Sequence, residues 1–227
     1  MSATSVLRTP TRPPDSGNNV SGSRARFAGV TFVVFFIASV VASSVPANKA
    51  ADAKWTAAYT GHSHQIEHLA TGVFLVLAAL SLLTLLATLW ERIAQASAPA
   101  RTSPVPLVAA GVSAACIAAG GVVMASISGT ELAGKFPLPS ADLLRFANTL
   151  GFALVAVGGM LAASFSVACL SRQGRAAGVL SRRVATFGLV VAVVILASVA
   201  FLPIAALWIW AIVITIQLGR RPALQAR

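Results

Sequence analysis

The sequence has few charged residues, and its longest apolar stretches have none. Only 10% of the 227 residues are charged, six are acidic and 57% are hydrophobic, which is too apolar for an ordinary soluble domain. The charge-free stretches are residues 27–45, 69–90, 105–128, 146–170 and 184–218. Proton relays, ion-coupled transport and pathways for charged substrates usually need ionisable groups within the membrane. The sequence therefore argues against these functions.

The sequence is also poor in the residues that catalysis and crosslinking need. No apolar stretch carries a paired carboxylate, a Ser–Lys pair or a His-Glu-x-x-His motif, so we expect a protein that is not an enzyme. The only two cysteines are Cys116 and Cys169. At a rise of about 1.5 Å per residue their depths in a membrane would differ by roughly 15 Å. We therefore expect no disulfide between them.

The apolar stretches predict an all-α fold, a polytopic membrane bundle of six transmembrane helices. Each of the first four stretches has about 19–25 residues, enough for one helical crossing. The fifth would extend about 52 Å as a single helix, beyond a hydrocarbon core of about 30 Å. Pro203 lies near its middle and can end a helix. We therefore divide it into residues 184–201 and 204–219, which completes a membrane domain over residues 27–219.

Positive charge is distributed unevenly among the loops of this domain. With the N-terminus in the cytoplasm, 13 of the 17 basic residues lie on the inner side, with only Asp15 and Glu91 as acids. The outer loops hold the other four basic residues and four acidic ones. The positive-inside rule then predicts a multi-pass protein of the plasma (inner) membrane with both termini cytoplasmic. Residues 1–26 read as a disordered basic tail and residues 220–227 as a second cytoplasmic tail.

The first apolar stretch could also be a cleaved signal peptide. Its run of about 19 residues exceeds the usual core of about 7–15 residues in such signals, and the tail before it is long. We therefore expect a retained helix, with cleavage near Ala42 as the alternative.

The basic residues predict a lipid partner and no nucleic acid. A pI near 11.6 would ordinarily indicate nucleic-acid binding, but the arginines stand in short clusters without interleaved aromatic residues. Anionic headgroups at the cytoplasmic face are the expected partner, and each nearby Lys or Arg contributes about 1 kcal/mol.

Small residues predict where helices pack closely. They concentrate in residues 105–128 and 146–170, with Gly120 and Gly158 among them, so we expect tight packing or association with a protein partner or a second copy there. The leucine-rich stretch 69–90 is expected to contact lipid. Three tryptophans, Trp55, Trp208 and Trp210, are expected at the outer membrane interface.

Three segments of the chain carry a resemblance. Residues 55–92 lead into a leucine-rich stretch that ends Leu-Trp-Glu-Arg, residues 139–151 begin Pro-Ser-Ala-Asp before an Ala/Gly-rich stretch, and residues 201–221 run from Phe-Leu-Pro to an Arg pair. In these segments the chain resembles a group of small bacterial six-span membrane proteins of unknown function. The resemblance implies an architecture, and it implies no activity and no functional residues.

One chemical cluster lies in the first outer loop, where residues 62–68 hold all three histidines of the protein. His64, Glu67 and His68 form a His-x-x-Glu-His pattern, the inverted order of some zinc hydrolases. On a helix His64 and His68 would share a face and could bind one Zn²⁺, with Glu67 as a base or ligand and His62 as a further ligand.

A polar helix start at the membrane interface explains the same residues without metal. A catalytic zinc site also needs a third protein ligand, for which the second outer loop offers Glu131 and Asp142. Three functions therefore remain open. The first is a non-enzymatic scaffold or regulatory membrane protein, the second a small permease or lipid-handling protein for neutral or hydrophobic substrates, and the third an extracytoplasmic metal-binding protein.

Overall fold

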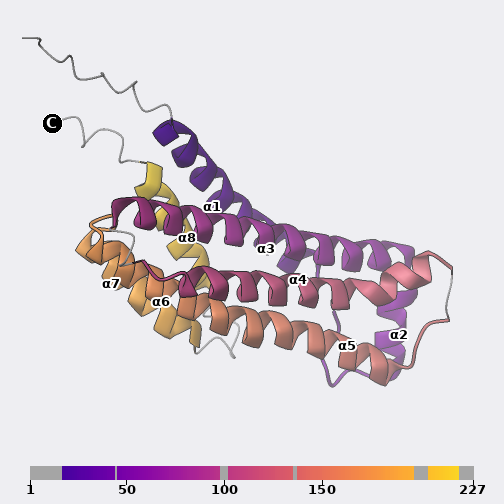
Figure 1. Ribbon diagram of the computed structural model, residues 1–227. Helices are drawn as coiled ribbons and strands as arrows, with labels where there is room; N and C mark the ends of the chain where they lie inside the picture. The colour runs from indigo at the N-terminus through magenta and orange to yellow at the C-terminus, as the bar shows by residue number, and fades with distance from the viewer. Residues whose placement is uncertain (1–16, 44, 98–101, 135–136, 197–203, 220–227) are drawn as a thin grey trace, which may run out of the picture.

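A computed structural model describes residues 17–43, 45–97, 102–134, 137–196 and 204–219, and within these ranges all regular secondary structure is helical, as predicted (Figure 1). The helices are α1 (Gly17–Ala42), α2 (Asp52–Thr60), α3 (His62–Ala96), α4 (Val105–Leu132), α5 (Ala141–Ala153), the π-helical turn η2 (Leu154–Gly159), α6 (Met160–Ala176), α7 (Arg182–Leu196) and α8 (Ile204–Gly219). α5, η2 and α6 follow one another without a break.

Three of the described helices are long and apolar enough to cross a membrane: α3, α4 and the continuous helix Ala141–Ala176. α1 and α8 contain shorter apolar helices, Arg26–Ala42 and Ala205–Gly219, and α7 has 15 residues. Six helices long enough to cross a membrane were expected, and three of the described helices have that length. Division of the last apolar stretch explains part of the shortfall, because the 16 residues of α8 extend only about 24 Å at 1.5 Å per residue. The turn predicted near Pro203 lies outside the described residues.

The start of α1 lies close to the end of α8. α1 begins at Gly17, and residues 17–26 of the predicted tail lie on it. At this end Arg26 Nη2 donates a hydrogen bond of 2.6 Å to the carbonyl oxygen of Gly219, and Arg92 Nη1 donates one of 2.8 Å to that of Leu218. Carbonyls in the last turn of a helix lack partners within the helix, so these two arginines tie α8 to α1 and α3.

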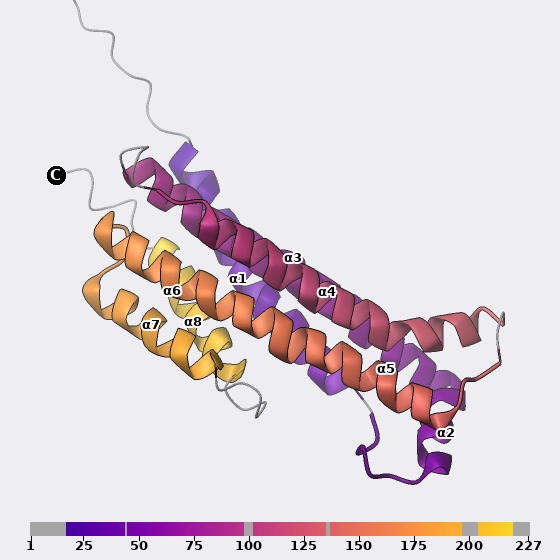
Figure 2. The same ribbon diagram turned by 60° about the horizontal axis from the view of Figure 1, so that its bottom comes forward.

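The helices form a closed ring in which chain order is also spatial order. α1 packs on α3, α3 on α4, α4 on the α5–α6 helix, α6 on α7, and α7 on α8, which returns to α1. The start of α1 and the end of α8 lie at the same end of the bundle (Figures 1 and 2). We call this the arginine end; the arginines whose side chains the structure describes there are Arg26, Arg92, Arg172, Arg175, Arg182 and Arg183. At the opposite end, the α2 end, α2 lies across the start of α3 and the start of α5.

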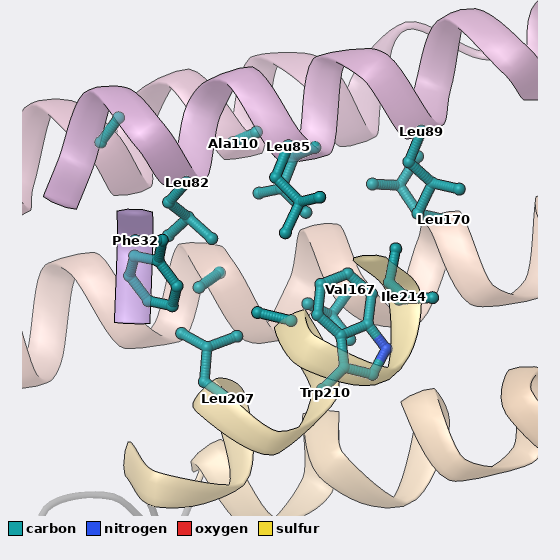
Figure 3. Close-up of a cluster of buried hydrophobic side chains, with 14 of the residues drawn as sticks. Phe32, Leu82, Leu85, Leu89, Ala110, Val167, Leu170, Leu207, Trp210 and Ile214 are labelled. Atoms are coloured by element: carbon teal, nitrogen blue, oxygen red, sulfur yellow. The ribbon is translucent and has the colours of Figure 1, made fainter. Parts of the chain in front are cut away.

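The centre of the bundle is built largely on α3, which corrects two expectations. Leu82, Leu85 and Leu89 are fully buried and meet side chains of α1, α6 and α8 (Figure 3), so this face of the leucine-rich helix contacts protein and not lipid. Trp210, expected at the membrane interface, is also fully buried in this cluster, and Trp55 is fully buried elsewhere.

Glycines bring α3, α4 and α5 together at backbone distance, as the small residues predicted. A Cβ atom placed on Gly72 of α3 would lie 2.7 Å from the carbonyl oxygen of Gly121 on α4. One placed on Gly120 would lie 2.6 Å from the carbonyl oxygen of Gly151 on α5. Real Cβ atoms essentially never approach so closely, so both interfaces depend on glycine. Cys116 and Cys169 are both free, as expected.

Candidate functional site at the α2 end

The strongest concentration of polar and aromatic side chains outside the arginine end lies under α2. Trp55, Ala58 and Tyr59 stand at three- and four-residue spacing, which places them on one face of the helix. This face is buried against Leu144 of α5. Partly buried apolar residues complete the cluster: Val45, Ala50, Ile127, Leu138 and Ala141. The cluster is separate from the central core and fastens α2 to the helix ends below it.

Arg145 of α5 holds α2 in place through charge and hydrogen bonds. Its Nη2 donates to Asp52 Oδ1 at 2.6 Å and to the carbonyl oxygen of Ala50 at 2.8 Å. Its Nη1 donates to Asp142 Oδ1 at 3.0 Å. The guanidinium carbon lies 5.8 Å from the centroid of the Trp55 ring, within the range of a cation–π contact. One arginine therefore joins the start of α2 to the first turn of α5.

An aromatic stack joins the end of α2 to the start of α3. The rings of Tyr59 and His68 lie 4.4 Å apart between centroids and are inclined by only 7°. Gln65 Nε2 donates a hydrogen bond of 3.1 Å to the carbonyl oxygen of Tyr59. Both ring side chains are buried, and burial raises the pKa of the Tyr59 phenol above its ordinary value of 10.0. The phenol therefore stays protonated at neutral pH.

The structure separates the residues of the predicted zinc site. His62 is exposed, and His64 Nδ1 lies 3.1 Å from Glu67 Oε2 at the surface. His68 is turned inward onto Tyr59. Residues four apart on a helix differ by about 40° in direction, and here that difference places one ring against solvent and the other against α2.

No group of three His, Cys, Asp or Glu residues within the described ranges is placed to hold a metal ion. Of the two candidate third ligands, Asp142 is engaged by Arg145. Zinc binding by His62, His64, Glu67 and His68 therefore stays a prediction from the sequence.

Several polar atoms at this end are buried without a hydrogen-bond partner among the described residues. They are Trp55 Nε1, His68 Nε2, Ser128 Oγ, Glu131 Oε2 and Arg145 Nε. Buried polar atoms usually have partners, so these five atoms are exceptions to that rule. The sequence did not single out Tyr59 or Arg145. Their signals were an aromatic pair at four-residue spacing (Trp55 and Tyr59) and the only arginine outside the inner loops.

Comparisons with protein-family models, with curated proteins and with solved structures found no match for this chain. The function must therefore be argued from its own residues. Two sets of charged groups engage one another at the α2 end: Arg145 meets two carboxylates, and His64 meets Glu67. The aromatic side chains pack among themselves and on Leu144. Such an arrangement positions α2 firmly on the ends of α3 and α5.

Proposed function

We propose that this chain is an integral membrane protein with six transmembrane segments and both termini in the cytoplasm. We further propose that it acts as a non-enzymatic scaffold or regulatory protein by binding other helices within the membrane. The placement of charge supports the orientation. The arginine end holds the six described arginines named above, the start of α1 and the end of α8, and the positive-inside rule assigns such an end to the cytoplasm. Tilting or local thinning of the bilayer accommodates the shorter helices.

The outward face of α4 carries the scaffold proposal. Gly111, Ala115 and Ala119 follow one another at four-residue spacing, and both alanines are exposed. A Cβ atom placed on Gly111 would meet nothing within 4 Å. Small residues at this spacing let a second helix approach closely within a membrane. Exposed valines of the same helix, Val108, Val112 and Val122, border these small residues.

The glycines from which association was first expected are used inside the bundle. Gly120 lies against Gly151, and a Cβ atom on Gly158 would lie 3.0 Å from Cys116 Sγ. A partner helix would therefore meet α4 on the Gly111 side. We therefore keep the expected association through the third apolar segment, residues 105–128. We assign it to Gly111, Ala115 and Ala119 in place of Gly120.

The packing observations favour this function over the two alternatives. A permease for neutral substrates needs a path between helices, whereas α3, α4 and α5 meet at backbone distance through Gly72, Gly120 and Gly121. A metal-binding protein needs converging ligands, whereas His68 is stacked on Tyr59. Scaffolding requires only a firm bundle with an open helix face.

The test is assembly of two differently tagged copies in native membranes, together with capture of other membrane proteins. Ala115→Ile adds bulk to the open face of α4. Ala205→Ile adds the same bulk at an exposed position at the start of α8 and serves as the matched control. We expect Ala115→Ile to reduce co-purification several-fold, because the helix backbones are held apart, and Ala205→Ile to leave it unchanged. Equal recovery with both variants would refute the proposed interface.

A further inference from the structure

A pocket of about 370 Å³ opens between α6 and α7 at the arginine end. Its lining comes from the last turns of α6 and the first turns of α7, and includes Ser171, Arg172, Arg175, Ala185, Thr186 and Leu189. The volume lies in the range of about 300–1,000 Å³ that is typical of small-molecule sites. The pocket lies far from α2 and plays no part in the arrangement described there.

The charge around this pocket is entirely positive on the helices that form it. Arg172 and Arg175 are exposed, and neither forms an ion pair within the described part of the chain. Arg182 and Arg183 add two charges in the first turn of α7, and the sequence has no acidic residue after Asp142. The one acidic residue on α3 at this end, Glu91, is exposed and pairs with none of these arginines. An anion would relieve the mutual repulsion of these groups.

A buried serine, Ser171, belongs to the lining. Ser171 is fully buried, and its Oγ has no hydrogen-bond partner among the described residues. Gly188 of α7 makes room for it, since a Cβ atom there would collide with Ser171 Oγ and lie 2.9 Å from Trp210 Nε1. Burial of a hydroxyl without a partner costs free energy. Ser171 is among the residues that line the pocket, so we expect a ligand oxygen bound there to accept the Ser171 proton and remove this cost.

We infer that the pocket binds a phosphate group, supplied by the headgroup of an anionic phospholipid. Arginine presents a planar fork of donors that fits phosphate oxygens in pairs, and the hydroxyls of Ser171 and Thr186 supply further donors. The wall also includes Ala185 and Leu189, which suit the glycerol and upper acyl carbons of a lipid. Basic pockets between membrane helices on the cytoplasmic side bind headgroups of this kind.

The lipid as the source of the phosphate rests on the membrane location proposed above. The pocket, its arginines and its hydroxyls do not depend on that location. A free phosphate ester shares the same chemistry, so the experiment compares the two sources directly.

The test measures the thermal unfolding of the full chain in a neutral detergent. Three probes are titrated: dioctanoyl phosphatidylglycerol, dioctanoyl phosphatidylcholine and inorganic phosphate. A ligand that binds only the folded state raises the unfolding temperature with concentration. We expect phosphatidylglycerol to give a saturable rise, and phosphatidylcholine, whose headgroup has no net charge, to give little. A rise of equal size with both lipids would overturn the inference. A saturable rise with inorganic phosphate that matches phosphatidylglycerol keeps the anion site and overturns the lipid as its source.

Paired variants separate the pocket from general surface charge. Arg172→Gln with Arg175→Gln removes two charges from the lining, and we expect binding of phosphatidylglycerol to weaken by about tenfold or more. Arg182→Gln with Arg183→Gln removes the same charge outside the lining, and we expect a change of less than about threefold. Equal weakening in both pairs would assign the binding to diffuse charge and overturn the pocket.

Ser171→Ala supplies a second readout. Removal of an unpartnered buried hydroxyl should leave the lipid-free protein as stable as before, while the affinity for phosphatidylglycerol falls several-fold. Unchanged affinity would remove Ser171 from the site. Failure of any of these tests is distinct from failure of the proposed assembly, because Ala115 of α4 lies outside the pocket.

Discussion

Ser113 of α4 donates a hydrogen bond of 2.8 Å to the carbonyl oxygen of Gly159, the last residue of the π-helical turn between α5 and α6. A π-helical turn interrupts the regular i→i−4 ladder of the helix, and a carbonyl without a partner is costly in an apolar interior. Ser113 is fully buried and adds a hydrogen bond from a neighbouring helix where this turn ends. Two further serines link helices in the same way: Ser164 donates to the carbonyl oxygen of Ala192, and Ser166 to that of Pro106.

We expect Ser113→Ala to reduce the free energy of unfolding by about 1 kcal/mol, as is usual for hydrogen bonds between membrane helices. The measurement is thermal or denaturant unfolding of the purified protein in detergent. Ser126→Ala is the matched control, because Ser126 is an exposed serine on the same helix that bonds only to the carbonyl oxygen of Val123, one turn earlier. An equal loss of unfolding free energy in both variants would show that the hydrogen bond between Ser113 and Gly159 adds no stability.

Glycines on α4 should differ sharply in their tolerance of a methyl group. Gly120→Ala would place a Cβ atom 2.6 Å from the carbonyl oxygen of Gly151 and 2.7 Å from Val155 Cγ2. The helices must then separate, and we expect a loss of about 1–3 kcal/mol in unfolding free energy. Gly111→Ala meets open space and should leave stability unchanged or raise it slightly. A stable Gly120→Ala variant would contradict the close approach of α4 and α5.

The positions of the helices followed from the sequence because apolar length and charge are local properties. The six predicted segments correspond to α1, α3, α4, the α5–α6 helix, α7 and α8. The direction in which side chains point did not follow so readily. Leucine has nearly the same environment in lipid and in a protein interior, so the sequence could not assign Leu82 and Leu85 to the core, where they are fully buried.

The sequence predicted only part of the candidate site at the α2 end, for a related reason. Three histidines within seven residues were visible as a cluster, but which ring faces inward depends on where α2 lies. The contact between Tyr59 and His68 is set by the turn at Gly61 between α2 and α3. The contact between Arg145 and Asp52 joins segments 93 residues apart. Such contacts leave no periodic signal in a single sequence.

Arg145 should stabilise the folded helix α2 against local unfolding. We expect Arg145→Gln to speed amide hydrogen exchange in residues 55–60 several-fold, because the bonds to Asp52, Asp142 and the Ala50 carbonyl are lost together. Arg145→Lys keeps the charge but lacks the guanidinium fork, so it should give an intermediate rate. Lys54→Gln is the control, since Lys54 is exposed on the same helix. Exchange in α2 that is indifferent to Arg145 would show that the apolar cluster holds the helix alone.

Tyr59 should titrate at an unusually high pH. Burial raises the pKa of its phenol above 10.0, so the folded protein binds this proton more tightly than the unfolded chain does. The stability that this group contributes is full below pH 10.0 and falls as the pH rises from there through the higher native pKa. Alkaline unfolding should therefore begin near the pKa of the unfolded phenol, and α2 is the helix that carries the group.

The measurement is direct because the chain contains a single tyrosine. Ultraviolet absorbance of the tyrosinate then reports Tyr59 alone, with a midpoint above 10.0 in the folded protein and a return to about 10 in denaturant. Tyr59→Phe should abolish this signal and remove its share of the alkaline loss of stability, while the ring keeps its place on His68. A folded-state midpoint at or below 10.0 would mean that the phenol is open to water, and the stack between α2 and α3 would then not exist in solution.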